Sequence, residues 1–172
     1  MARVITIVGD AGVGKSRLLE EFMGAVDRDS ANVWLFRGRA GQEPGRRPYA
    51  LLRDLLANRF AIHDGDRAAE ARQKLEQGLV GFVGPAGAEL APFIGHLIGF
   101  DYAASPQLHG ILDNARQLRD RALHALATLF TAVTEDHPAM ICLEDIHWAD
   151  DSSLDAIEYL FRACEQLPVL FV

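Results

Sequence analysis

Hydrophobic positions along this chain fall into two kinds of segment that follow one another. Four short apolar runs predict strands, and they lie at residues 3–8, 33–37, 139–143 and 168–172. The first run is continuous and rich in β-branched residues, which is typical of a strand buried on both faces of a parallel sheet. Strands that alternate with helical segments predict an α/β fold with a doubly wound, mostly parallel sheet.

Helical segments are indicated by apolar residues that recur three and four positions apart. The sequence predicts helices at 15–26, 49–60 and 66–79, a buried helix within 90–98, a long helix ending near 134 and a last helix after position 150. Either Asp150 or Asp151 is the expected N-cap of the last helix. The second and third strands are therefore joined by a long, mostly helical insertion.

A glycine-rich loop joins the first strand to the first helix and is the most specific chemical signal in the chain. It fits the phosphate-binding pattern G-x-x-x-x-G-K-[ST] with Gly9, Asp10, Ala11, Gly12, Val13, Gly14, Lys15 and Ser16. Glycines let the backbone approach phosphates, and a helix N-terminus offers unpaired N–H groups with a partial positive charge. Lys15 can reach the β- and γ-phosphates, and the Ser16 hydroxyl can hold Mg²⁺. The alternative, a glycine-rich turn that binds nothing, is disfavoured by the strand–loop–helix context.

Composition limits the classes of protein to which the chain can belong. Its 172 residues suit one domain with a sizeable core, and a net charge of −7 argues against non-specific binding to nucleic acid. Cys142 and Cys164 do not have the spacing of a disulfide framework or a metal site. Without a long apolar run or a signal-peptide pattern, we expect a cytoplasmic protein with reduced thiols and no membrane partner.

The third predicted strand ends in two acids, Glu144 and Asp145. In P-loop proteins, such a strand carries the Walker B acid, which holds Mg²⁺ directly or through water. A second acid beside it can orient or deprotonate the attacking water. By position, Glu144 takes the metal side and Asp145 the water side. Walker B usually has Asp first, so the Glu-Asp order leaves this assignment open.

Together, the loop and the acids resemble a known family. Gly9 to Leu19, combined with Leu143-Glu-Asp-Ile-His-Trp-Ala-Asp150, is similar to the signal-transduction ATPases with numerous domains (STAND), a branch of the AAA+-like P-loop NTPases. The nearest resemblance is to modules that follow class III adenylate/guanylate cyclase domains and to modules of LuxR-type regulators in bacteria. Residues 36–40, 47–49 and 93–101 also look like this subgroup.

The resemblance implies a three-layer αβα fold with ATP and Mg²⁺ as cofactors. It implies that the 9–16 loop and Arg17 bind the nucleotide, that Lys15, Glu144 and Asp145 act in catalysis, and that Ser16, Glu144 and Asp145 hold the metal. Beyond the strand, we expect Trp148 to pack and Asp150 to cap the next helix. His147 is equally consistent with a polar group near the site and with a surface residue.

The resemblance also sets an expectation about completeness. In the family, the fourth strand ends in a polar sensor, whereas this chain ends at Val172 inside that strand. The family's fifth strand, helical lid, winged-helix element and repeat-containing sensor region have no counterpart here. We therefore expect residues 1–172 to be a C-terminally truncated ATPase core. Its expected partners are ATP/ADP, the cyclase and helical-repeat domains of a larger regulator, and other copies through nucleotide-driven self-association.

The function that these signals favour is an ATP-binding switch module with slow ATP hydrolysis. One alternative is a non-hydrolysing nucleotide-binding or interaction module that has kept the motif. A P-loop small-molecule kinase is a weaker alternative, because no acceptor pocket or arginine-rich lid can be identified. A GTPase is weaker still, because the sequence has no N-K-x-D segment.

Overall fold

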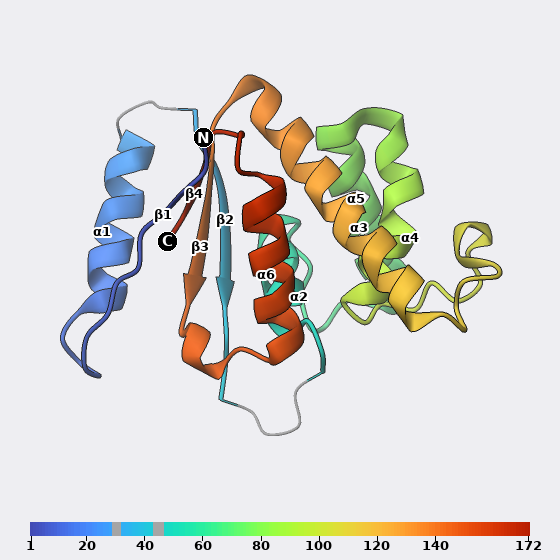
Figure 1. Cartoon of the computed structure of the whole chain (residues 1–172), viewed down its shortest axis with the longest axis horizontal. Helices are drawn as coiled ribbons and strands as arrows, with labels where there is room; N and C mark the ends of the chain where they lie inside the picture. Colours follow the sequence, from blue (N-terminus) through green and yellow to red (C-terminus); the bar gives the residue numbers. More distant parts are fainter. Residues whose placement is uncertain (29–31, 43–46) are drawn as a thin grey trace.

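The computed structural model describes residues 1–28, 32–42 and 47–172 and contains one parallel sheet (Figure 1). The strands are β1 (Arg3–Val4), β2 (Trp34–Arg39), β3 (Ala139–Glu144) and β4 (Val169–Phe171). Their order across the sheet is β1-β4-β3-β2, and each neighbouring pair is parallel. The predicted α/β fold with a parallel sheet is therefore confirmed.

Helices cover both faces of the sheet (Figure 1). Helix α1 (Lys15–Arg28) lies on one face, and α2 (Ala50–Arg59), α5 (Ala115–Asp136) and α6 (Asp151–Ala163) lie toward the other. Alternation along β3 explains the layers, because successive side chains of a strand point to opposite faces. Met140 and Cys142 pack with Leu19 and Met23 of α1, whereas Ile141 joins the larger core on the opposite face.

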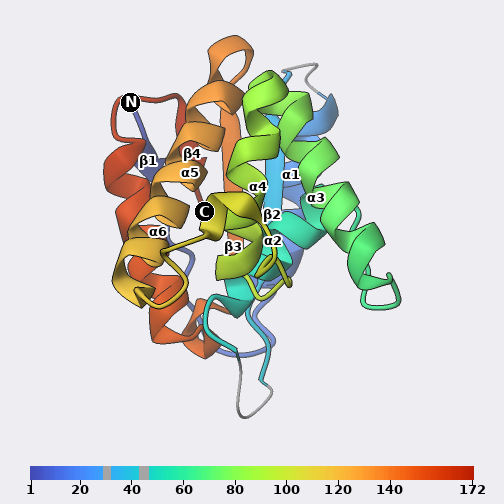
Figure 2. The same ribbon diagram turned by 90° about the vertical axis from the view of Figure 1, so that its right-hand side faces the viewer.

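The long connection between β2 and β3 is helical, as predicted. It contains α2, α3 (Ala68–Val83), α4 (Gly87–Leu97) and α5, with short 3-10 turns at Gly84–Ala86 and Pro106–Leu108. Figure 2 shows α3, α4 and α5 side by side, and Figure 1 shows that they lie on the opposite side of the sheet from α1. Their contact surfaces form part of the larger core, and the fully buried side chains of these three helices include Leu75, Leu79, Ile94, Leu126, Leu129 and Phe130.

Residues 68–97 are long and apolar enough, by composition alone, to be considered as a membrane span. In the structure, however, this segment is two helices that pack against each other and not one rod. The C-cap of α3 is Gly84, which has φ of +68°, a value that glycine adopts more readily than other residues, and Pro85 follows it. Leu75, Leu79 and Ile94 of the segment are fully buried, and Phe82 packs against Trp34 of β2.

The first strand differs from its prediction. Residues 3–8 are expected to be buried on both faces, but β1 spans Arg3–Val4 only. Val4, Ile5 and Val8 are 54%, 47% and 88% exposed. Strand β1 lies at the edge of the sheet, where it bonds to β4 alone, so no strand covers its other side, and Val8 lies beyond the strand, next to the glycine-rich loop.

The observed ends of two other elements differ from the predicted ones. Strand β2 continues to Arg39, whereas the apolar pattern ended at 37, because polar residues at the end of this strand still pair with β3. Helix α5 begins at Ala115, with Asn114 as its N-cap, and ends at Asp136, two residues beyond the predicted end near 134. Part of the loop predicted between the second strand and the following helix, residues 43–46, lies outside the described residues.

Candidate nucleotide-binding site

The glycine-rich loop leads directly into the first turn of α1. Gly12 and Gly14 have φ values of +85° and +96°, which residues with a Cβ atom rarely adopt. This conformation explains why glycines occupy these two positions of the motif. Helix α1 begins at Lys15, so the N–H groups of its first turn have no partner within the helix and carry the positive end of its dipole.

Lys15 folds back over its own loop. Its Nζ donates to the carbonyl oxygens of Gly9 and Asp10 at 2.7 and 2.8 Å. Neutral carbonyls are weaker partners for an ammonium than a charged oxygen is, so a phosphate placed in the loop would compete for this side chain. Ser16 and Arg17 lie exposed beside it in the first turn of α1.

The two acids lie at the end of β3 and just after it. Glu144 is the last residue of the strand and is 7% exposed. Asp145 has φ of +56°, a left-handed conformation that Asp tolerates better than most residues, and it starts the turn Ile146–Trp148. This turn directs the backbone toward α6, whereas the Asp145 carboxylate stays near the carboxyl end of the sheet.

One pocket of about 400 Å³ brings the loop and the acids together. Its lining includes Lys15, Ser16, Glu144 and Asp145, four residues predicted from separate motifs. His147 also lines the pocket. The loop residues 9–14 and Arg17 are exposed and lie outside that lining. The remaining wall is mostly apolar and is formed by Val4, Ile5, Ile7, Leu154, Ile157 and Phe161.

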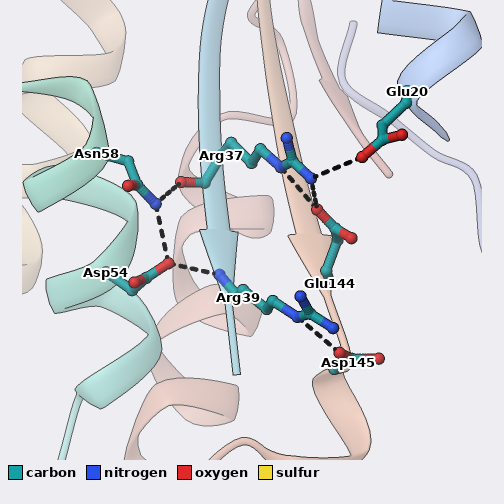
Figure 3. A network of polar contacts seen from close by, with 7 residues as sticks. All are labelled: Glu20, Arg37, Arg39, Asp54, Asn58, Glu144 and Asp145. Atoms are coloured by element: carbon teal, nitrogen blue, oxygen red, sulfur yellow. Dashed lines mark hydrogen bonds and ion pairs between the residues drawn. The ribbon is translucent and has the colours of Figure 1, made fainter. Parts of the chain in front are cut away.

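Two arginines of β2 bind the two acids (Figure 3). Arg37 contacts Oε1 of Glu144 through Nε at 2.7 Å and through Nη2 at 2.6 Å. Arg39 donates from Nε to Oδ2 of Asp145 at 2.9 Å. The hydrogen bond and the charge of Asp145 raise the pKa of Arg39 above its ordinary value.

Helix α2 holds the backbone of β2 where these arginines project (Figure 3). The Asp54 carboxylate accepts from the backbone N–H of Arg39 at 2.7 Å and from the Asn58 amide at 3.0 Å. Asn58 also donates to the carbonyl oxygen of Arg37 at 3.1 Å. Sequence reasoning missed all four residues. Arg-Gly-Arg at the end of a strand was an available signal, because alternate residues share one face of a strand.

Asp150 connects two helices that are distant in sequence. Its carboxylate accepts from the backbone N–H of Ser153 at 2.9 Å, which makes it the N-cap of α6, as predicted. It also accepts from the backbone N–H groups of Tyr49 and Ala50, at 2.9 and 3.1 Å, at the start of α2. The Ser153 hydroxyl donates a further bond of 2.6 Å. Burial raises the pKa of Asp150, but these hydrogen bonds outweigh it and leave the pKa below its ordinary value.

The aromatic residues after the acids lie at the surface. Trp148 is 44% exposed, so the expected packing of its side chain is only partial. The short turn that follows Asp145 carries the indole outward, where it contacts the His147 ring at a centroid distance of 5.0 Å. His147 is exposed yet lines the pocket, so it lies next to the candidate site.

The donor set of the pocket suits Mg²⁺ that arrives with phosphates. Among the described residues, no three His, Cys, Asp or Glu side chains are grouped so that they could hold a metal by themselves. Mg²⁺ commonly takes one or two carboxylates together with phosphate oxygens and waters. The Ser16 hydroxyl and the carboxylates of Glu144 and Asp145 offer such a partial set. These residues therefore fit a magnesium ion whose remaining ligands come from a nucleotide and water.

Comparisons with known proteins agree with this site. The family model of the AAA ATPase domain matches residues 1–172. An uncharacterized protein of Rhizobium meliloti (strain 1021) is 27% identical over 179 residues, an alignment that covers 98% of this chain and 16% of that relative. No solved structure matches the chain significantly. Because the family model covers every residue of the sequence, the chain belongs to the AAA ATPase domain family.

Proposed function

We propose that this chain is an ATP-binding switch module that hydrolyses ATP slowly within a multidomain bacterial signalling or transcription regulator. The observation that carries the proposal is the single pocket lined by Lys15 and Ser16 from the loop and by Glu144 and Asp145 from β3. Membership of the AAA ATPase domain family supports a nucleotide as the ligand.

Each part of the site has a defined task in this proposal. Backbone N–H groups at the start of α1 bind phosphate oxygens, and Lys15 leaves its carbonyl partners to contact the β- and γ-phosphates. Asp145, the more exposed acid, orients the attacking water, and Glu144 lies on the metal side. Bound Mg²⁺ would neutralise charge on the phosphates. When the γ-phosphate leaves, the loop and the acids lose the ligand that joined them.

The setting of the module is part of the proposal. The chain spans 16% of the length of its Rhizobium meliloti relative, which agrees with a module inside a much larger protein. We propose a STAND-type regulator in the cytoplasm, with cyclase or helical-repeat domains as neighbours and nucleotide-driven self-association as an output. Residues 1–172 would then be one core unit of that protein.

Nucleotide binding by the purified chain tests the proposal. We expect fluorescent ATP to bind in the presence of Mg²⁺ and Lys15→Ala to weaken this binding about tenfold or more, because the variant loses a cation on the phosphates. Lys74→Ala is the matched control, since Lys74 is the only other lysine and pairs with Asp66 in the insertion. Equal binding by the wild type and Lys15→Ala, or no binding by the wild type, would contradict the proposal.

A non-hydrolysing module is the second candidate, and the arginine contacts favour it. Each acid has one carboxylate oxygen bound by an arginine, and this contact competes with any action of the acid on water in this arrangement. Phosphate release separates the two candidates. A switch that hydrolyses ATP releases phosphate, and Asp145→Asn abolishes that release while nucleotide binding remains. If the wild type binds nucleotide but releases no more phosphate than Asp145→Asn does, the chain is the non-hydrolysing module.

A further inference from the structure

The carboxylate of Glu144 already has a cation beside it. Arg37 reaches the same oxygen, Oε1, with both Nε and Nη2, at 2.7 and 2.6 Å. The Glu144 side chain is 6% exposed, so water contributes little to neutralising its charge. The same guanidinium lies 3.8 Å from the Glu20 carboxylate of α1 (Figure 3).

We propose that Arg37 is a positioning residue that withholds Glu144 from free divalent cations, so that Mg²⁺ joins the site together with the nucleotide and not before it. This inference rests on the proposed function for the identity of the ligand. It goes beyond that function in two ways. It gives Arg37 a task, and it states the order in which metal and nucleotide bind.

Arg37 is better placed for this task than Arg39. The Arg39 side chain is 65% exposed and reaches Asp145 through one hydrogen bond, so water and salt compete with it directly. Arg37 is 42% exposed, makes two short contacts and binds the more buried of the two acids. Its backbone carbonyl is also bound by Asn58 of α2, which limits the movement of this part of β2.

The position of Arg37 also explains how a nucleotide could shift Glu144 from binding Arg37 to binding a metal ion. Glu20 lies on α1, the helix that begins at Lys15, and Glu144 lies at the end of β3. Arg37 therefore contacts both α1, the helix that follows the glycine-rich loop, and β3, the strand that carries the acids. A free metal ion has to displace a guanidinium that is already hydrogen-bonded, whereas a metal ion that brings phosphates gains further oxygen ligands and contacts with Lys15.

Titration of nucleotide-free protein with Mn²⁺, followed by electron paramagnetic resonance, tests the inference without relying on ATP binding. We expect weak binding to the wild type and binding tighter by about tenfold or more to Arg37→Gln, because a positive charge next to the carboxylate is lost. Arg37→Lys keeps the charge and should resemble the wild type. Arg116→Gln, which removes an exposed arginine of α5, is the charge-matched control.

Arg37→Gln leaves a buried carboxylate without its partner, so its folding needs a separate check. The double variant Arg37→Gln/Glu144→Gln removes both charges and should lose the added Mn²⁺ binding. Mn²⁺ should also raise the melting temperature of Arg37→Gln but not that of the double variant. The inference is overturned if Arg37→Gln binds Mn²⁺ no more tightly than the wild type, if the double variant keeps the gain, or if Arg37→Gln fails to fold even with Mn²⁺. Failure to bind ATP would contradict the proposed function and leave this metal result unchanged.

Discussion

At the scale of the residue, single polar groups join segments that lie far apart in the chain. Asp150 is the clearest case, because one carboxylate accepts hydrogen bonds from the starts of both α2 and α6. A negative charge at a helix N-terminus also interacts favourably with the helix dipole, and here two dipoles point at the same group. The side chain therefore stabilises the contact between the two helices as well as each helix end.

Replacing Asp150 should lower stability in a pH-dependent way. We expect Asp150→Asn to reduce the free energy of unfolding by about 1–2 kcal/mol at neutral pH, because the amide has one acceptor oxygen and no charge. The pKa of Asp150 is lowered in the folded state, so its stabilising effect is present above about pH 4 and is lost as the pH falls through the folded pKa. Urea unfolding at neutral and acid pH measures both. If the difference in free energy of unfolding between the wild type and Asp150→Asn is as large at acid pH as at neutral pH, this account is contradicted.

The two cysteines should be unreactive while the protein is folded. Burial raises the pKa of Cys142 and of Cys164 to about 11, and for Cys142 the charge of Glu144 adds to the effect. Both thiols therefore stay protonated at neutral pH, and neither is exposed. We expect Ellman's reagent to label neither thiol in native protein and both thiols in denaturant. Rapid labelling under native conditions would show that one of the two faces of the sheet opens readily.

At the scale of the element, two glycines of α3 have opposite requirements. A Cβ on Gly78 would lie 2.1 Å from the Phe60 ring, so the absence of a side chain lets α3 approach the end of α2. Gly81, three positions later, has nothing within 4 Å of its Cβ position and is exposed. One glycine is needed for packing, and the other only lowers the helix propensity of α3.

Alanine at these two positions should therefore change stability in opposite directions. We expect Gly78→Ala to destabilise the protein by about 1–3 kcal/mol through overpacking. Gly81→Ala should stabilise it by about 0.5–1 kcal/mol, because alanine favours the helix. Thermal or urea unfolding of the two variants measures the difference. Equal effects would mean that the packing of α3 against Phe60 is loose.

At the scale of the whole molecule, the protection of backbone amides against hydrogen exchange is expected to differ strongly from strand to strand. Strand β3 has a neighbour on each side and helices on both faces, whereas β1 is an exposed edge bonded to β4 alone. Hydrogen exchange should therefore be slowest in residues 139–144 and much faster in residues 3–8. Mass spectrometry of peptic peptides measures this. Similar protection of both segments would indicate that another chain or segment covers the β1 edge in solution.

Patterns within short stretches of sequence predicted those features that are formed by residues close together in the chain. The loop from Gly9 to Ser16, the two acids and the capping role of Asp150 could all be identified within short segments. The arginine contacts could not, because Arg37 and Glu144 are 107 positions apart and meet only through the register of β2 with β3. The exposure of β1 was missed for a similar reason, since its place at the edge depends on the order of all four strands.

The Asp150 contact also has a consequence for the order of folding. Tyr49 and Asp150 are 101 positions apart, so the N-terminus of α2 lacks its cap until the chain has been made through β3 and the start of α6. Closing so large a loop is entropically unfavourable and follows the formation of local contacts. Helices α3, α4 and α5 meet through nearer neighbours and are expected to associate first. The edge of the sheet that carries the candidate site would then be completed last, when one carboxylate connects α2 of the insertion to the start of α6.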